Sequence, residues 1–364
     1  MRTGVGAAPV AVTVLLAALT GTIVLAVLAA PAPASAQAQD VPIADVQEGV
    51  LCIPSDAGLA ELSGLAMLDG RLFAVPDAGA DESVVELGDD CSVVRRIPAP
   101  VDPYDVEDLA AGPDRRLWLS DTGDNTARRE TVALISLDPA TGAGDLYRMT
   151  YPSGARDGET LLIGRDGVPL FVSKALFGAS TVYRPADGKT LTDLASPGPN
   201  PLEEVGVLRL GPTDTPGGPL AGGSSTLITG GAVSADGTVA AVRTYTDVYL
   251  FHAPDGDLVA ALAGGPQLRI PVAGEPQGEA VAFTPDGDLL TASESNGGPL
   301  PQIRVWRGVT GLFAAPETAE SGTSSVAVAE AAAAAGAAVV LAAAAGWWWR
   351  RRRRPARGRP ASRR

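Results

Sequence analysis

The 364-residue sequence predicts an all-β domain built from a repeated four-stranded unit, followed by one C-terminal transmembrane helix. Three observations support this. A short apolar strand, an Asp-Gly-type turn and a second apolar strand recur in that order five times. Further strand-like runs follow each copy, which gives four strands in about 40–50 residues, the signature of a β-propeller. Outside the two ends, no window shows the sustained 3.6-residue apolar periodicity of helices.

The N-terminus, residues 1–38, predicts a signal peptide. Arg2 is its only charged residue, an apolar run extends from Val10 to Ala30, and Ala34-Ser35-Ala36 supplies an A-x-A cleavage site. An uncleaved N-terminal anchor is the alternative, because the apolar run is long for a signal. Export would place the following domain in an oxidising compartment.

Two lone cysteines flank the first repeat copy. Cys52 lies in a strand-like run, residues 46–53, ahead of that copy, and Cys91 lies at the start of its outer strand. In an oxidising compartment such a pair usually forms a disulfide, with two buried thiols as the alternative. The last copy lacks a fourth strand, so we expect the run 46–53 to supply it and close the ring.

One position keeps the same register in the repeat copies. It lies seven residues before the acid of the turn, and in three copies it holds Glu107, Glu159 and Glu279. A fourth copy has Thr229 at this position. The first copy has one residue fewer before its turn and places Ser63 there. Successive positions are 44, 52, 70 and 50 residues apart. Five blades are therefore countable, and the register argues against a pair of β-sandwiches.

The predicted propeller occupies residues 41–312. The 70-residue interval contains a Pro/Gly-rich stretch, 196–225, which leaves room for a sixth blade. In the fourth copy the apolar run at 258–262 is interpreted as the outer strand.

The C-terminus predicts a stalk at 313–325, a transmembrane helix at 326–349 and a cytoplasmic Arg-rich tail at 350–364. The 19 residues from Ala331 to Trp349 carry no charge, and at ~1.5 Å per residue they span roughly the hydrocarbon thickness of a bilayer. Three Trp end this run as an interfacial belt, and nine Arg follow it as a positive-inside signal. This order predicts a single-pass cell-membrane protein with an extracellular propeller.

Alternatives for this end are an Ala-rich soluble helix and a nucleic-acid-binding tail, and neither explains the order of the apolar run, Trp belt and Arg cluster. A sorting signal cut by a sortase is a third possibility. Residues 315–319 contain the Pro-x-Thr centre of the LPxTG motif but lack its Leu and Gly.

The formal charge of −14 combines an acidic central part with a basic C-terminal tail of nine Arg. Residues 41–325 contain 18 Lys and Arg against 40 Asp and Glu, a net charge of −22. Such a surface repels nucleic acid and attracts cations, although it can also serve only solubility. Because His252 is the only histidine, multi-histidine zinc sites are excluded, and two cysteines exclude four-cysteine clusters. Carboxylates are the remaining metal ligands.

Propeller geometry brings residues just before the first strand and just after the second to one axial face. A hard cation such as Ca²⁺ takes several oxygen ligands, so Ca²⁺ is the predicted cofactor. The candidate metal ligands are Glu107, Asp121, Asp124, Glu159 and Glu279. The candidate ligand-binding residues are Asp77, Asn125, Lys174, Arg243, Tyr245 and Glu294.

Two other interpretations of this face stay open. The acids can cap backbone N–H groups or form Asx turns. The basic residues Arg156, Lys174 and Arg243 can pair with the acids or bind a phosphate or carboxylate. If the protein is a hydrolase, Glu107, Glu159 and Arg156 are the candidate catalytic residues, acting with a metal-activated water.

Several segments, which cover most of residues 59–308, resemble a family of exported actinobacterial propellers. They are LAELSGLA, VEDLAAGPD, LWLSDTGDN, ARRETVAL, YPSGARDGETLL, GGAVSADGTVAAVRTYTDVYLF and EPQGEAVAFTPDG. That family is loosely similar to phytase-like ("esterase-like") propellers and, more distantly, to calcium-dependent lactonase propellers. The resemblance implies a propeller fold and an axial Ca²⁺-type site at Glu107, Asp121, Glu159 and Glu279. The sequence departs from the recurring Glu at Ser63 and Thr229.

These observations predict a membrane-anchored binding or scaffolding module with a small-molecule or envelope ligand. The alternative is a metal-dependent hydrolase of phosphate or carboxylic esters or lactones that uses the same axial face. A purely structural envelope protein is the third class.

Overall fold

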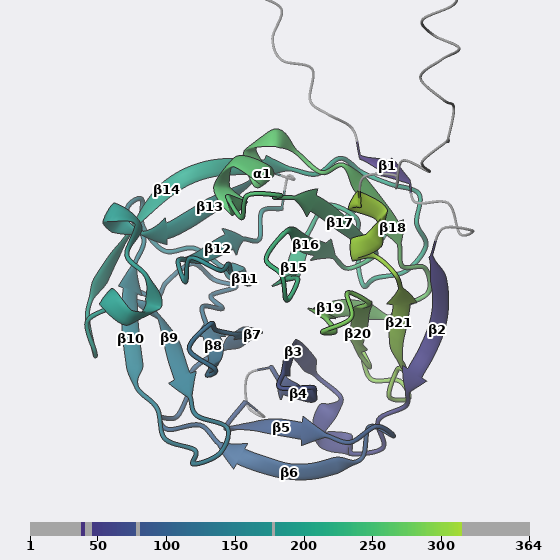
Figure 1. Cartoon of the computed structure of the whole chain (residues 1–364), viewed down its shortest axis with the longest axis horizontal. Helices are drawn as coiled ribbons and strands as arrows, with labels where there is room; N and C mark the ends of the chain where they lie inside the picture. The colour runs from purple at the N-terminus through teal and green to yellow at the C-terminus, as the bar shows by residue number, and fades with distance from the viewer. Residues whose placement is uncertain (1–37, 41–45, 78–80, 177–178, 315–364) are drawn as a thin grey trace, which may run out of the picture. The chain divides into compact units, whose positions relative to one another are not determined.

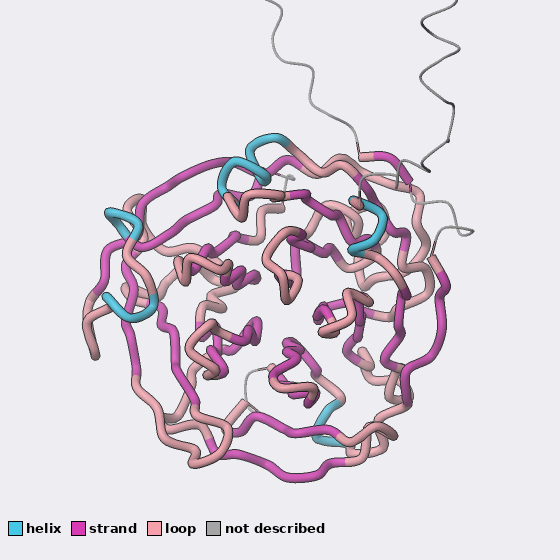
Figure 2. Tube along the Cα trace, in the orientation of Figure 1, coloured by secondary structure: helices cyan, strands magenta, loops and turns pink. Residues whose placement is uncertain are grey.

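A computed structural model describes residues 38–40, 46–77, 81–176 and 179–314 (Figure 1). The chain divides into two units, residues 1–309 and 310–364. The described part of the first unit is all-β, with sheets that radiate around a central axis and a few short helices at the periphery (Figure 2). Of the second unit, the structure describes only the 3-10 helix Thr310–Phe313 and Ala314.

In the described ranges, five four-stranded blades follow one another around the axis. Blade 1 comprises β3 (Leu62–Leu68), β4 (Arg71–Pro76), β5 (Ser83–Leu87) and β6 (Val93–Pro98). Blade 2 comprises β7 (Val106–Ala111), β8 (Leu117–Asp121), β9 (Val132–Leu137) and β10 (Leu146–Thr150). Blade 3 comprises β11 (Gly158–Ile163), β12 (Pro169–Ser173), β13 (Ala179–Pro185) and β14 (Asn200–Arg209).

Blade 4 comprises β15 (Ile228–Val233), β16 (Val239–Thr244), β17 (Asp247–His252) and β18 (Leu268–Pro271). Blade 5 comprises β19 (Gln277–Phe283), β20 (Leu289–Glu294), β21 (Ile303–Arg307) and β2 (Gln47–Cys52). The first strands β3, β7, β11, β15 and β19 surround the axis and contact one another in sequence order. This arrangement confirms the all-β propeller prediction.

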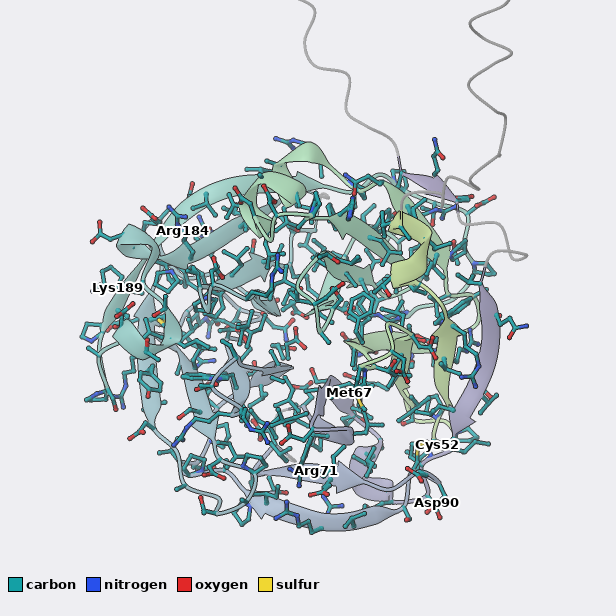
Figure 3. The ribbon with its side chains drawn as sticks, in the orientation of Figure 1. Cys52, Met67, Arg71, Asp90, Arg184 and Lys189 are labelled. Atoms are coloured by element: carbon teal, nitrogen blue, oxygen red, sulfur yellow. A yellow bond between two sulfur atoms is a disulfide. The ribbon has the colours of Figure 1, made fainter. Side chains whose placement is uncertain are left out.

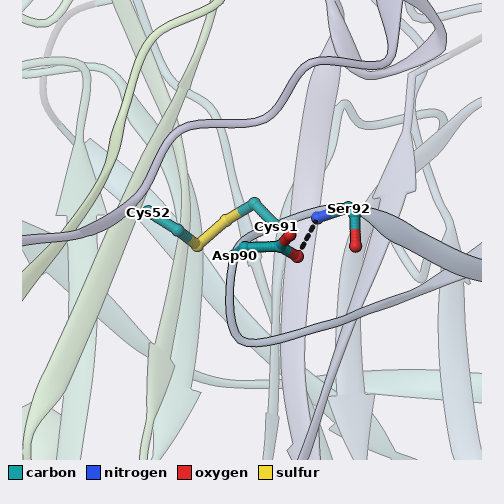
Figure 4. The surroundings of a disulfide bond; sticks show 4 residues. All are labelled: Cys52, Asp90, Cys91 and Ser92. Atoms are coloured by element: carbon teal, nitrogen blue, oxygen red, sulfur yellow. Dashed lines mark hydrogen bonds between the residues drawn. A yellow bond between two sulfur atoms is a disulfide. The ribbon is translucent and has the colours of Figure 1, made fainter.

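The N-terminal strand closes the ring as predicted. β2 pairs antiparallel with β21 and becomes the outer strand of blade 5. The predicted disulfide is present: Cys52 at the end of β2 bonds to Cys91 in the turn before β6, with their Cα atoms 5.6 Å apart (Figure 4). In that turn, Asp90 Oδ1 accepts a hydrogen bond from the Ser92 N–H. The bond therefore ties blade 5 to blade 1, where the circle of blades closes.

The long third interval holds no sixth blade in the part of the chain that the structure describes. Its Pro/Gly-rich stretch contributes β14, and residues 210–227 contain turns but no strand. β14 also pairs in parallel with β10, through Met149↔Asn200 and Thr150↔Pro201. This pairing joins blades 2 and 3 into one eight-stranded sheet.

Two local features of blade 4 differ from the sequence expectations. The apolar run at 258–262 is not the outer strand but lies in helix α1 (Leu258–Gly264), which begins after Asp257, whose side chain accepts the Ala260 N–H. The outer strand is β18, ten residues further on. β1 (Gln39–Asp40) pairs in parallel with β18, so the folded domain includes residues just before the expected start at 41.

The core lies between the blades. Second and third strands such as β8, β9, β12 and β16 are buried along their whole length, because each blade packs both faces against its neighbours. One cluster joins Phe73 of blade 1 to Leu117 and Ile135 of blade 2. This packing fixes the first strands around the axis and so positions the candidate site.

The predicted transmembrane helix 326–349 and tail 350–364 lie outside the described residues, as do nearly all of the signal peptide 1–38 and most of the stalk 313–325. Within the described residues, no helix has the length and apolar character needed to span a bilayer.

Candidate functional site

The recurring position of the repeat lies at a β-bulge in every blade. The strand register skips one residue in each first strand, and the skipped residues are Ser63, Glu107, Glu159, Thr229 and Glu279. A bulge leaves its residue out of the ladder and re-aims the side chain. The sequence register therefore corresponds to a structural device that presents one side chain per blade.

Two of the five bulge residues bind the neighbouring blade. Ser63 Oγ donates to the Glu107 carbonyl at 2.9 Å, and Thr229 Oγ1 donates to the Gly278 carbonyl at 2.8 Å. Where the sequence lacks the recurring Glu, a short hydroxyl thus links adjacent blades. The complete acidic ring is absent, and three bulge carboxylates remain.

Glu107 belongs to two carboxylate triads. The first is Asp77, Asp105 and Glu107, and the second is Glu107, Asp157 and Glu159. In each triad one oxygen per residue lies within 4.8 Å of the other two. Such a spacing allows one small cation to contact all three carboxylates.

Gly123 lies against the first triad, and its lack of a side chain leaves space for two of the carboxylates. The Gly123 N–H donates to the Asp105 carbonyl at 3.1 Å. A Cβ on Gly123 would lie 2.5 Å from Asp105 Oδ2 and would also collide with Glu107 Oε1. Glycine is therefore required here, because any side chain would occupy the space of the two carboxylates.

Burial and mutual repulsion raise the pKa values of these acids. Burial, helped by the charge of Asp77, raises the pKa of Asp105 to about 7. Burial also raises the pKa of Glu159 to about 8, against the opposing effect of Lys174. The pKa of Glu107 is raised well above its ordinary value by burial and by Glu159. The site therefore favours protons or a cation over free carboxylates.

One oxygen of this cluster has no hydrogen-bond partner in the described structure. Glu159 is 0% exposed, and its Oε2 is unpaired, while its Oε1 accepts a hydrogen bond from Lys174 Nζ at 2.7 Å. A buried carboxylate oxygen without a donor is costly unless a proton or a cation compensates it.

Lys174 is the cation that faces this part of the ring. Its side chain is 14% exposed, and Nζ lies 5.5 Å from the centre of the Tyr245 ring. Burial lowers the pKa of Lys174, but the charges of Glu159 and Glu279 outweigh that effect and raise it well above its ordinary value. Lys174 is therefore charged, and it partly neutralises the carboxylates of blades 3 and 5.

Gln277 bridges the two acids of blade 5. Its Nε2 donates to Glu279 Oε1 at 3.1 Å and to Glu294 Oε2 at 2.6 Å. Burial, together with the charge of Glu61, raises the pKa of Glu294 to about 8. Blade 5 thus adds acids to the ring without joining either triad.

Asp108, next to Glu107, fixes the spacing of three first strands. Its carboxylate accepts hydrogen bonds from the N–H groups of Leu109 at 2.8 Å, Leu161 at 2.8 Å and Gly231 at 3.1 Å. Burial raises the pKa of Asp108, and the three donors oppose that rise. Because Leu161 and Gly231 belong to β11 and β15, this one side chain holds the bulges of blades 2, 3 and 4 in a fixed relation.

Two predicted metal ligands have structural partners instead. Asp121 Oδ1 accepts the Asp105 N–H and Arg129 Nη2, and Asp124 Oδ2 accepts the N–H groups of Arg128 and Arg129. Both carboxylates therefore bond backbone N–H groups, as the capping alternative describes, and Asp121 also pairs with Arg129. Asp124 also touches the site indirectly, because its N–H donates to Asp157 Oδ1 at 2.8 Å.

Arg243, predicted to bind a ligand, is a buried structural residue. It is 0% exposed and donates to the carbonyls of Ala280 and Ala292 and to Glu275 Oε2 at 2.7 Å. These bonds link blade 4 to blade 5. Arg156, a conditional catalytic residue, donates within its own loop, to the Ala155 carbonyl and Ser153 Oγ.

The remaining predicted residues divide between cluster and surface. Asp77, Lys174 and Tyr245 follow their second strands, Glu294 is the last residue of its own, and all four take part in the interactions described above. Asn125 is exposed.

Two triad members, Asp105 and Asp157, are not among the predicted ligands. Both lie two residues before a bulge Glu, in Asp105-Val-Glu107 and Asp157-Gly-Glu159. The repeat holds Gln277 and Glu61 at the same offset before Glu279 and Ser63. This second polar position in register is the signal that identifies them.

Comparisons with known proteins give no family. No family model matches the chain, and no curated protein matches its sequence. Among solved structures, a Xanthomonas campestris gluconolactonase is 15% identical, with a TM-score of 0.44 and coverage of 72% of this chain and 90% of that one. A glutaminyl cyclase from Myxococcus xanthus is 15% identical, with a TM-score of 0.42 and coverage of 71% and 95%.

A PQQ-bound aldose sugar dehydrogenase from Streptomyces coelicolor is 11% identical, with a TM-score of 0.41 and coverage of 73% and 99%. At these levels the likenesses carry no argument about function. The resemblance to phytase-like propellers therefore remains a prediction from the sequence, and the proposals below depend on the geometry of the site.

Proposed function

We propose that this protein is an exported, membrane-anchored propeller whose axial carboxylates bind Ca²⁺ and present that face to a small-molecule or envelope ligand. The observation that supports the proposal is a pair of carboxylate triads that share Glu107, the second of which contains the fully buried Glu159 Oε2 without a hydrogen-bond partner. A bound cation would offset the burial and the mutual repulsion that raise the pKa values of these acids.

The residues present fit a hard divalent cation. Asp77, Asp105 and Glu107 offer three carboxylates on one side, and Asp157 and Glu159 offer two more on the other. Oxygen ligands of this kind suit Ca²⁺, and thiolate or multi-histidine ligands are absent from the described residues. When bound, the cation would supply a positive charge that attracts and polarises oxygen atoms of a ligand.

The charge distribution supports an extracellular setting. The −22 of residues 41–325 raises the local concentration of cations near the domain, whereas the nine Arg beyond the apolar run are typical of a cytoplasmic flank. Anchoring and export rest on the sequence alone.

A hydrolase that uses the same face is the second candidate. The observation that favours it is a cleft of about 340 Å³ lined by Arg128, Arg129, Glu130 and Tyr151, on the loops that also position Asp157. The Arg128 side chain would suit an anionic substrate such as a phosphate or carboxylic ester, whereas the Arg129 guanidinium already donates to Asp121 Oδ1 and the Gly123 carbonyl.

Thermal unfolding of the full-length protein in detergent tests both candidates. The proposal expects melting several degrees higher in millimolar Ca²⁺ than in excess chelator, and Asp105→Asn should abolish that difference. Asp89→Asn, at an exposed turn in blade 1, is the matched control and should keep it. An equal melting temperature in both conditions would refute the cation site.

Activity separates the two candidates. If the protein hydrolyses a member of an ester, phosphoester and lactone panel, and Glu107→Gln and chelation each abolish the reaction, the hydrolase is correct. If Ca²⁺ binds and no member of the panel is hydrolysed, the binding function holds.

A further inference from the structure

The axial face that carries the acids also carries exposed apolar side chains. Tyr104 is 71% exposed and Leu176 is 73% exposed, which makes them the two most exposed large apolar side chains of the described residues. Tyr104 directly precedes Asp105 at the start of blade 2, and Leu176 follows Lys174 after the second strand of blade 3. Both therefore lie at the ends of strands that meet on this face, and a partly apolar rim around polar groups is typical of a ligand site.

Arg129 holds the ring of Tyr104 in place. Its Cζ lies 4.8 Å from the centre of the ring. The same guanidinium donates to Asp121 Oδ1 at 2.9 Å and to the Gly123 carbonyl at 2.7 Å, so it is itself fixed. With Arg129 on one side and most of the side chain exposed, the ring offers its other face as a rigid platform. A rigid platform limits the entropy that is lost when a ligand binds.

This exposed ring is unique among the residues that the structure describes. Tyr104 is the one exposed aromatic side chain in that part of the chain. Arg71 in blade 1 (Figure 3) also lies over an aromatic ring, that of Phe73, at 5.2 Å, but Phe73 is fully buried and has no free face. The pair of Arg129 and Tyr104 therefore combines a fixed ring with an accessible one.

The platform suits the C–H face of a sugar ring better than an organic cation. The face of an aromatic ring is negative and attracts weakly positive C–H groups. It would attract a cation as well, but the charge of Arg129 on the opposite face would repel that cation. The aromatic cage that typically holds quaternary ammonium ligands also needs further exposed rings, and the described residues offer Tyr104 alone.

The cleft of about 340 Å³ adjoins this platform, because Arg129 both lines the cleft and stacks on Tyr104. Within the cleft, Arg128 donates hydrogen bonds and Glu130 accepts them. Sugar hydroxyls use both kinds of partner, since each one donates and accepts. The charge of Arg129 also acts on Asp105, so the platform, the cleft and the first triad meet around this arginine.

We infer that the ligand of the axial face is a sugar, whose ring stacks on Tyr104 while its hydroxyl groups reach the cleft and the cation at the first triad. The inference rests on the proposed function and names the class of its ligand. Hydroxyl groups are oxygen ligands of the kind that Ca²⁺ accepts. Because Tyr104 and Asp105 are consecutive, a ring stacked on the first brings its hydroxyls to the second. A free sugar and an envelope glycan share this chemistry.

Saturation-transfer NMR and calorimetry test the inference on the full-length protein, in millimolar Ca²⁺ and a detergent without a sugar headgroup. The probes are glucose, galactose, mannose and N-acetylglucosamine, each as the free sugar and as a short oligosaccharide. At least one should bind and receive saturation mainly at the C–H protons of one ring face. Tighter binding of the oligosaccharide would identify a glycan as the source, and equal binding would identify the free sugar.

Three variants locate the sugar on the platform. Tyr104→Ala should weaken sugar binding about tenfold, because it removes the stacking surface. Tyr104→Phe keeps the ring and should bind like the wild type. Val94→Ala is the matched control, because it trims another exposed apolar side chain, 60% exposed on β6, and should also leave sugar binding unchanged. Since Tyr104 is exposed, all three variants should keep the melting temperature and the Ca²⁺ affinity of the wild type.

The outcomes distinguish this inference from the proposed function. If Ca²⁺ binds but no sugar of the panel does, the inference is wrong and the cation site stands. If a sugar binds equally well to Tyr104→Ala, or equally well in excess chelator, stacking on Tyr104 or contact with the cation is refuted. If the protein binds no Ca²⁺ at all, the proposed function itself fails.

Discussion

The affinity for Ca²⁺ should fall steeply as the solution is acidified from pH 8 to pH 6. The first triad binds the cation through ionised carboxylates, and burial raises the pKa of Asp105 to about 7. About nine tenths of this group is then ionised at pH 8 and about one tenth at pH 6. Asp105 alone should therefore weaken the apparent affinity about tenfold, and the raised pKa of Glu107 acts in the same direction.

Titration calorimetry at several pH values measures this effect directly. Binding near pH 7 should also release protons, which appear as a dependence of the observed heat on the ionisation enthalpy of the buffer. Asp89→Asn should show the same pH dependence as the wild type. A dissociation constant that stays the same from pH 6 to pH 8, with no proton release, would refute the assignment of Asp105 as a ligand with a raised pKa.

Three further predictions concern stability. In excess chelator the melting temperature should fall as the pH rises from about 4 to 8. The pKa values of the buried axial acids are raised, so over this range the folded state holds more protons than the unfolded chain. A melting temperature that rises with pH would contradict this prediction. Replacing Cys52 and Cys91 by Ser should lower the free energy of unfolding by about 4 kcal/mol, because the disulfide joins residues 39 positions apart and its loss frees that loop in the unfolded chain. The melting temperature should then fall by roughly 8 °C. A calorimetric shift of less than about 2 °C would contradict a stabilising role of the disulfide in ring closure. Arg243→Met should lower the free energy of unfolding by about 3–5 kcal/mol, because it leaves the buried Glu275 without its partner. The Ca²⁺ affinity of the folded protein should be unchanged. A loss of affinity would instead place Arg243 in the cation site.

The ring of blades could be predicted because each blade has the same local sequence pattern. An apolar run, a turn acid and a second apolar run recur in register, and the offset of Glu107, Glu159 and Glu279 marks equivalent positions in three blades. The structure adds that this position is a bulge. A bulge shifts the alternation of a strand by one residue, but here it lies at the second or third residue of each strand, where too few residues precede it for the sequence to reveal the shift.

Side-chain direction limited the prediction of the site. Asp121 and Asp124 are acids beside the end of a second strand, as Asp77 is, but hydrogen bonds from the Arg128 and Arg129 backbone and side chain turn their carboxylates to the loop. Such bonds depend on loop conformation, which strand periodicity does not determine.

Short apolar segments limited the prediction of local structure in the same way. The run in α1 is compatible with either a strand or a helix, because seven residues are too few to establish a period. The N-cap Asp257 is the one local signal that favours a helix.

The most direct test of a Ca²⁺-binding axial site is a crystal structure of the protein grown with Tb³⁺ in place of Ca²⁺, with anomalous difference maps. The site described above predicts one strong peak in contact with Asp77, Asp105 and Glu107, at the oxygen distances of roughly 2.3–2.6 Å that are typical of calcium sites. Strong peaks confined to the outer surface, with none among these three carboxylates, would contradict it.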